Sequence, residues 1–189
     1  MTATVEHGFV RDAYGNYTTF DVAGGNAVTS ALLSQNGEVA GTYTDASFLS
    51  HGFVRDTLGN ITTFDAVVPG GITDGYGINA SGEIAGEYLQ SGSYQGFVRD
   101  TLGNITTFKI SGLPYAGVAG IADNGNVYGV SKTGSDRGWK YTGAGVVSYF
   151  NDPSAGPKGS SPSSASGNNK AAGVYWDSQG VLHDFYMSQ

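Results

Sequence analysis

Apolar and polar residues alternate along short stretches of the chain, and glycine-containing turns separate these stretches. Residues 51–56 (HGFVRD) alternate, a turn with the letters DTLGN follows, and residues 60–65 (NITTFD) alternate again. A period of two over four to eight residues is typical of a half-buried strand, and Gly at the position of positive φ is typical of a hairpin turn. Residues around 72–79 and residues 83–89 predict a second hairpin. No segment shows the 3.6-residue period of a helix.

The same pattern recurs along the chain. The phrase at 51–64 (HGFVRDTLGNITTF) returns at 95–108 (QGFVRDTLGNITTF), and a close variant lies at 7–20 (HGFVRDAYGNYTTF). A divergent copy lies at 137–150 (RGWKYTGAGVVSYF), and a fragment (HDFYM) begins at His183. We therefore treat 1–189 as a single repeat domain with units 7–50, 51–94, 95–136 and 137–182 and a partial fifth unit, 183–189.

The size of the unit predicts the architecture. Four strands in about 44 residues correspond to one blade of a β-propeller. A four-stranded sheet cannot bury both of its faces alone, so such units stack on one another. We expect an all-β fold, a β-propeller of four-stranded antiparallel blades, with four blades and closure by the terminal strands. A five-bladed ring and an open or strand-exchanged repeat array are the alternatives.

The fourth unit departs from this pattern at residues 153–169 (PSAGPKGSSPSSASGNN). This stretch contains three of the five prolines and is rich in serine, with few side chains to bury. Such a composition is typical of a loop. We expect the strand at this place to be weak or replaced by a loop.

Composition narrows the class of protein. Nine basic and sixteen acidic residues give a formal net charge of -7, which disfavours nucleic acid and anionic membranes as partners. Cysteine is absent, so disulfides and thiolate metal sites are excluded. No apolar run of 18 residues predicts membrane insertion, and the first ten residues (MTATVEHGFV) do not resemble a signal peptide.

The repeated phrases resemble those of a known family. GFVRD-x-x-G-N-x-T-T-F-D and N-x-x-G-x-I-x-G-x-Y are similar to the HAF-family repeat of bacterial proteins, and the similarity covers most of the chain. The resemblance implies a β-propeller-like array in a bacterial protein that is extracellular or bound to the cell surface. It implies no established activity and no catalytic residues. Gly8, Gly52 and Gly96 stand where the family usually has Ala.

Side chains that recur at one repeat position are candidates for ligand binding. The arginine of GFVRD could bind an anionic group or a sugar bidentately, although an Arg next to an Asp can equally brace two blades. The recurrent tyrosine suits sugar stacking and equally a half-buried strand. Two tryptophans appear in the divergent fourth unit. The candidate ligand-binding residues are Arg11, Arg55, Arg99, Tyr43, Tyr88, Tyr175, Trp139 and Trp176.

Motifs for catalysis and metal binding are weak. His7, His51 and His183 share one repeat position, but Gln95 and Arg137 replace them in the other units, which disfavours a metal site. The sequence contains no G-x-S-x-G and no G-x-x-x-x-G-K-[ST], and no nucleophile with a base stands out. We expect no catalytic residues, no metal and no cofactor.

Together these observations favour a non-catalytic binding module, lectin-like, that presents repeated sites to a glycan or protein ligand. Several weak sites on one rigid body give avidity. One alternative is a small carbohydrate- or ester-active enzyme with its site in the fourth unit. Another is a purely structural repeat protein without a small ligand. Near-identical units also favour a homo-oligomer formed by exchange of terminal strands. Equivalent polar pockets would indicate the module, and one pocket with a perturbed titrating pair would indicate the enzyme.

Overall fold

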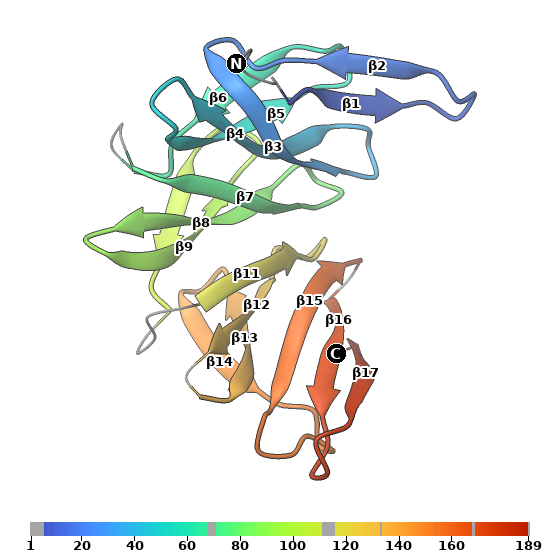
Figure 1. Ribbon diagram of the computed structural model, residues 1–189, viewed down its shortest axis with the longest axis vertical. Helices are drawn as coiled ribbons and strands as arrows, with labels where there is room; N and C mark the ends of the chain where they lie inside the picture. Colours follow the sequence, from blue (N-terminus) through green and yellow to red (C-terminus); the bar gives the residue numbers. More distant parts are fainter. Residues whose placement is uncertain (1–5, 68–70, 111–115, 133, 168, 189) are drawn as a thin grey trace, which may run out of the picture.

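A computed structural model describes residues 6–67, 71–110, 116–132, 134–167 and 169–188. These residues form seventeen strands in five antiparallel sheets, which follow one another along a C-shaped arc (Figure 1). The all-β class and the four-stranded antiparallel blade predicted from the sequence are confirmed. Among the described residues, no helix is long and apolar enough to cross a membrane.

The strands are numbered in chain order. The first sheet contains β1 (Gly8–Arg11) and β2 (Tyr17–Phe20). The second contains β3 (Gly25–Leu33), β4 (Val39–Asp45), β5 (Ser50–Arg55) and β6 (Ile61–Phe64). The third contains β7 (Thr73–Ile78), β8 (Ile84–Gln90), β9 (Ser93–Arg99) and β10 (Ile105–Phe108). The fourth contains β11 (Ala116–Ile121), β12 (Val127–Lys132), β13 (Asp136–Thr142) and β14 (Val146–Phe150). The fifth contains β15 (Ser160–Ser166), β16 (Lys170–Trp176) and β17 (Leu182–Ser188).

The repeated phrase forms the hairpin that its alternation predicts. In the second sheet, Gly52 of β5 lies opposite Phe64 of β6. Gly59 takes a φ of 94° at the turn, where a side chain would be strained. The carboxylate of Asp56 accepts the backbone N–H groups of Leu58 and Asn60 at 2.9 and 2.8 Å, so it stabilises its own turn.

The blades are out of phase with the sequence units. Each complete blade joins the second hairpin of one unit to the first hairpin of the next. In the second sheet, β3 and β4 come from unit 7–50, whereas β5 and β6 consist almost entirely of residues from unit 51–94. Backbone hydrogen bonds between β4 and β5 therefore connect consecutive units.

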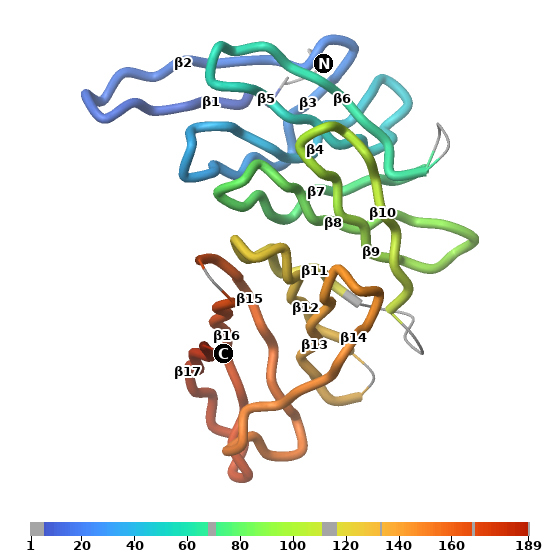
Figure 2. The backbone as a smooth tube through the Cα atoms, turned by 180° about the vertical axis from the view of Figure 1, so that it is seen from behind, coloured from blue at the N-terminus to red at the C-terminus, as the bar shows by residue number. Residues whose placement is uncertain are grey.

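The arc is open. Three blades have four strands, whereas the terminal sheets, β1–β2 and β15–β17, have two and three. No strand pairing joins these two sheets among the described residues, and they lie at opposite ends of the arc (Figure 2). The closed four-bladed ring is therefore not formed, and the described residues adopt the open array that was the alternative. The third-strand position beside β16 is occupied by β17 and not by a strand of the first sheet.

Aromatic side chains at recurring repeat positions fill the spaces between blades. Phe53, Phe97 and Trp139 occupy the same position in β5, β9 and β13, and each is 0% exposed. Phe97 meets Phe64 of the preceding blade edge to face, with ring centroids 5.9 Å apart. Phe20 meets Phe53 in the same way at 5.8 Å. Aromatic contacts thus join the first three pairs of neighbouring sheets, the third pair through Phe108 and Trp139 at 6.1 Å.

The expectation of a weak strand or a loop within 153–169 is wrong for the second half of that stretch. Residues 160–166 form β15, which pairs with β16 along its length. Within the sheet β15 has β16 alone as a neighbour, and its ladder shifts register between Pro162 and Ser164. Proline is tolerated at such an edge because its missing N–H is not needed there. Ser160 is buried and accepts the N–H of Asp152 at 2.7 Å.

Candidate functional site

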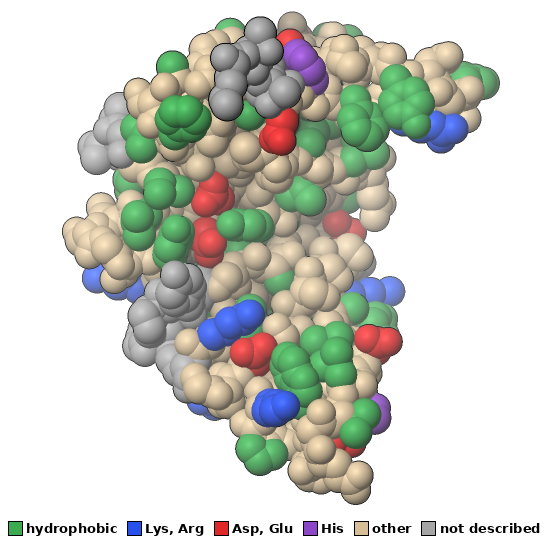
Figure 3. Space-filling view, viewed as in Figure 1, with side chains coloured by type: hydrophobic (Ala, Val, Ile, Leu, Met, Phe, Trp, Pro, Cys, Tyr) green, Lys and Arg blue, Asp and Glu red, His purple; other side chains and the backbone are tan. Residues whose placement is uncertain are grey.

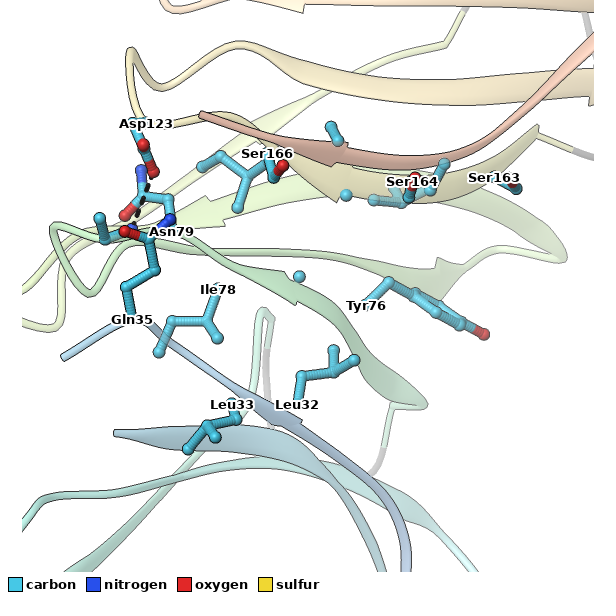
Figure 4. A pocket seen from close by; sticks show the side chains of 17 residues that line it. Leu32, Leu33, Gln35, Tyr76, Ile78, Asn79, Asp123, Ser163, Ser164 and Ser166 are labelled. Carbon is cyan, nitrogen blue, oxygen red and sulfur yellow. Dashed lines mark hydrogen bonds between the residues drawn. The ribbon is translucent and has the colours of Figure 1, made fainter. Parts of the chain in front are cut away.

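The innermost strands of four sheets, β3, β7, β11 and β15, contact one another along the inner side of the arc. They line a cavity of about 460 Å3, which we call the axial cavity (Figure 4). Leu32 of β3 and Ile78 of β7 lie in the space between these two strands, and β15 supplies the hydroxyl groups of Ser164 and Ser166. The molecular surface is hollowed on this side of the arc (Figure 3). One wall of the axial cavity is thus apolar and another carries hydroxyl groups.

Inter-blade hydrogen bonds hold one end of the axial cavity. The carboxylate of Asp123 accepts the N–H of Ala80 at 3.0 Å (Figure 4). The amide of Asn79 donates to the carbonyl of Ala122 at 3.2 Å. Both bonds join the turn after β7 to the turn after β11. We therefore assign Asn79 and Asp123 to the connection between blades.

Tyr76 lies at the other end and connects the axial cavity to two carboxylates that are not part of its lining. Asp74 of β7 and Glu87 of β8 are directly opposite each other in the ladder. Tyr76 lines the axial cavity and is 41% exposed, and it forms a side-chain hydrogen bond with Glu87. Ser50 bonds to Asp74, and the backbone of Val118 bonds to Glu87. The pair therefore connects the cavity wall to both neighbouring blades.

The environment favours the protonated form of this pair. Burial is the main cause that raises the pKa of Glu87 to about 7, and the negative charge of Asp74 raises it further, against the hydrogen bonds from Tyr76 and Val118. Burial also raises the pKa of Asp74, which the bond from Ser50 partly offsets. The Oε2 atom of Glu87 is buried and has no hydrogen-bond partner. Near neutral pH, Glu87 can therefore either donate or accept a hydrogen bond.

The carboxylate is specific to one blade. Thr42, Val130 and Val174 occupy the position of Glu87 in the other units. The hydroxyl of Thr42 accepts the N–H of Gly75 in the next blade at 3.0 Å, much as Glu87 accepts that of Val118. A neutral side chain can thus make the inter-blade contact, so this contact does not require a charge. Sequence reasoning missed Glu87, although the change from VAGTY to IAGEY between otherwise similar phrases was the available signal.

Replacing Glu87 by Gln is expected to make stability less dependent on pH. The ordinary pKa of Glu is 4.5 and the folded value is about 7, so the folded state binds this proton more tightly than the unfolded state does. The resulting stabilisation is full below pH 4.5 and is lost as pH rises through 7. Between pH 5 and 8 the free energy of unfolding of the wild type should fall by about 2 kcal/mol more than that of the variant, after allowance for solvent screening. Urea denaturation at several pH values measures this difference.

A matched control is Glu6→Gln, because Glu6 is an exposed glutamate at the N-terminal end of the arc. It removes one glutamate charge at another position, so the comparison separates the effect of the Glu87 position from the loss of a charge. Equal pH dependence in the wild type and in Glu87→Gln would contradict the raised pKa.

The predicted arginines contact aromatic rings. The guanidinium of Arg55 lies 5.5 Å from the ring centroid of Phe20 in the preceding sheet, and that of Arg99 lies 5.1 Å from Phe64. Arg11 lies 5.9 Å from Tyr17 of its own hairpin. The cation–π contacts of Arg55 and Arg99 therefore connect neighbouring blades. The adjacent aspartates bond to their own turns.

The predicted aromatic residues are mostly inaccessible. Tyr88 is 2% exposed and its hydroxyl bonds to Gln95, while Trp139 is 0% exposed. Tyr43 is 8% exposed and stacks on His51. Tyr175 and Trp176 are half-buried on β16. None of the eight predicted residues lines the axial cavity, and the unusual aromatics Trp139 and Tyr141 of the fourth unit belong to the core.

Within the described ranges, no three His, Cys, Asp or Glu side chains lie close enough together to hold a metal ion. The axial cavity offers hydroxyl groups and the ring of Tyr76, and a carboxylate pair lies next to that tyrosine.

Comparisons with known proteins identify the fold. No protein-family model matches the chain, and no curated protein matches it in sequence. Among solved structures, a streptogramin B lyase superposes with a TM-score of 0.58 at 12% identity, over 98% of this chain and 63% of that one. Virginiamycin B lyase from Staphylococcus aureus superposes at 0.60 with 14% identity, over 95% and 62%. TolB from Acinetobacter baumannii superposes at 0.56 with 14% identity, over 96% and 48%.

The chain therefore spans less than two thirds of the length of these structures. At such identities the similarity concerns the fold alone. The chain has a β-propeller-like scaffold.

Proposed function

We propose that this chain is a non-catalytic binding module that holds a neutral, hydroxyl-rich ligand of the glycan class in the axial cavity. The observation that carries the proposal is the chemistry of the cavity wall. Serine hydroxyl groups of β15 lie on one side, and the exposed ring of Tyr76 lies at one end. Sugars combine hydroxyl groups with apolar ring faces, so such a wall suits them. Among the described residues no Lys or Arg lines the cavity, and the net charge of -7 disfavours an anionic ligand.

This proposal replaces repeated sites with one shared site. The axial cavity receives side chains from four successive sheets, so it belongs to the arc and not to any single unit. The burial of Tyr88 and Trp139 gives no support to a separate stacking site on each blade. An extracellular or cell-surface location rests on the resemblance to HAF repeats and stays a prediction.

The test is a glycan array followed by calorimetric titration of the best ligand. Saturable binding with one site per chain is expected. Tyr76→Ala should weaken this binding about tenfold or more, because loss of an aromatic stacking contact costs about 1.5 kcal/mol.

The matched control is Tyr14→Ala, which removes a tyrosine that is 92% exposed at the tip of the first hairpin. It should leave the affinity unchanged. Binding that Tyr76→Ala does not weaken, or a blank array, would refute a glycan site in the axial cavity.

The carboxylate pair favours a second candidate function. A carboxyl group with a pKa near 7 can exchange protons efficiently at neutral pH. An enzyme that hydrolyses a glycan or an ester would therefore have its site at Asp74 and Glu87, and not in the fourth unit. New reducing ends or released acid during incubation with the bound ligand would support this candidate. Glu87→Gln should then abolish turnover while the ligand still binds.

A further inference from the structure

In the second sheet, which is a complete blade, the side chain of His51 contacts residues on both sides of its strand, and neither terminal sheet contains all of these contacts. His51 of β5 stacks on Tyr43 of β4, with ring centroids 5.2 Å apart. Its Nδ1 lies 2.7 Å from Asp65, which follows β6, and its Nε2 lies 3.4 Å from Asp45, which ends β4. This position therefore receives groups from the second, third and fourth strands of one blade.

Each terminal sheet holds one part of the same arrangement. His7, which precedes β1, lies 2.5 Å from Asp21, the counterpart of Asp65, and its side chain is 54% exposed. His183 of β17 stacks on Tyr175 at 5.1 Å and lies 3.0 Å from Asp177, the counterparts of Tyr43 and Asp45. The N-terminal sheet thus has the third- and fourth-strand groups, and the C-terminal sheet has the second- and third-strand groups but no counterpart of Asp65.

The aromatic core also indicates that the N-terminal sheet and β16 have complementary parts of one blade. Phe9 of β1 occupies the repeat position of Phe53 and Phe97, but it is 59% exposed, whereas they are fully buried. In the complete blades these rings lie beside a glycine of the second strand, such as Gly86. On β16 the corresponding Gly173 lies opposite Phe185 of β17. Apolar side chains consequently gather on the surface of the projecting first hairpin (Figure 3).

The strand β17 is poorly suited to carry a fourth strand. In β5 a Cβ added at Gly52 would lie 2.4 Å from the ring of Phe64, so the fourth strand requires glycine there. Gly8 of β1 meets Phe20 of β2 in the same way. β17 has Asp184 at this position, directly after its histidine. A fourth strand like β6 cannot cover this side chain, whereas β1 and β2 already form the required pair.

We propose that the β1–β2 hairpin docks onto β16 of a second copy of this chain in place of β17. The result is a four-stranded blade, with β15 and β16 from one copy and β1 and β2 from the other. Pairing on β16 is exchanged and not lost, and Phe9 becomes buried in the place that Phe185 now occupies. The gain is the fourth strand, because β2 completes a sheet that has three strands with β17.

The geometry of the arc favours a second copy over closure within one chain. The terminal sheets lie at opposite ends of the arc (Figures 1 and 2). Three complete blades and one rebuilt blade give four blades per copy. Two copies joined at both ends would contain about eight blades, which is within the usual range for propellers. This inference is independent of the proposed ligand.

A cysteine cross-link tests the exchange, because the chain contains no cysteine of its own. In the rebuilt blade His7 lies opposite Tyr175, as His51 lies opposite Tyr43. Directly opposite residues have Cα atoms about 4.5 to 5.5 Å apart, which allows a disulfide. His7→Cys combined with Tyr175→Cys should give, under mild oxidation, a reducible species of twice 19.5 kDa on a denaturing gel.

The matched control is Tyr175→Cys combined with His183→Cys. These positions lie opposite each other when β17 pairs with β16, so their disulfide holds β17 in place and should keep the chain monomeric. Light scattering of the unmodified chain gives an independent measurement of its mass. A variant that lacks residues 183–189 should have a mass closer to that of the dimer. The proposal would be overturned if the full chain and the shortened variant were both monomeric at all concentrations, or if the His7→Cys, Tyr175→Cys cross-link formed within a single chain.

Discussion

Replacing Phe97 by alanine is expected to lower the free energy of unfolding by about 3 to 5 kcal/mol. The ring of Phe97 is 0% exposed and packs with Ile84 and Tyr88 of its own blade and Ala40 of the preceding one. Its removal leaves a cavity between two blades, and the edge-to-face contact with Phe64 is lost as well. Urea denaturation followed by circular dichroism measures the change.

The control for this prediction is Leu102→Ala in the hairpin that follows Phe97. Leu102 is also a large apolar residue, but it is 86% exposed at the turn. Its truncation should change the free energy of unfolding by less than about 0.5 kcal/mol. Similar losses for both variants would show that the aromatic layer does not carry the stability of the arc.

Replacing Gly86 by alanine is expected to destabilise the chain by about 3 kcal/mol, although a single methyl group is added. The new Cβ would lie 2.1 Å from the carbonyl oxygen of Asp74 and 2.7 Å from the ring of Phe97. The first of these atoms belongs to the backbone of β7, so it cannot move without a shift of the strand. The change should appear as a lower midpoint in urea denaturation.

Gly117→Ala provides the comparison. Gly117 is also a strand glycine, but a Cβ there would meet nothing closer than the side chain of Val130, at 3.9 Å. The substitution should leave stability unchanged or raise it slightly, because alanine reduces the freedom of the unfolded chain. If both substitutions had the same effect, close approach between strands would not explain the glycines of the repeat.

Local structure was largely predictable from the sequence because it depends on neighbouring residues. The period of two and the turn glycine specify the hairpin of Phe53 and Phe64, and recurrence of Phe97 at the same position predicts its burial. The open arc was not predictable, since the phrases at β1 and β17 both begin with His-x-Phe and the sequence does not specify which of them pairs with β16. The strand β15 was not predicted because it contains Pro162, and local propensity disfavours proline in a strand. An edge strand tolerates proline, but its position at the edge is known only from the structure.

The candidate site was less predictable than the fold. Tyr88 and the arginines were candidates because they recur at one repeat position. In the structure Tyr88 lies in the core, and Arg55 and Arg99 lie between blades. The carboxylate pair occurs once, and Asp74 and Glu87 are thirteen residues apart in sequence. Only the register of β7 and β8 brings them together. A single ionisable residue in an otherwise conserved repeat phrase was the relevant signal, because a unique function does not repeat.

The phase difference between sequence units and blades affects how such a chain can lengthen by duplication. A boundary between two units falls between the second and third strands of one sheet, so a newly inserted unit is joined to its neighbours by backbone hydrogen bonds. Backbone hydrogen bonds do not depend on the identity of the side chains. A duplicate inserted at this boundary is therefore tolerated before its side chains have adapted to the neighbouring blades. The thirteen identical residues that begin at Gly52 and Gly96 are what a recent insertion of this kind would leave.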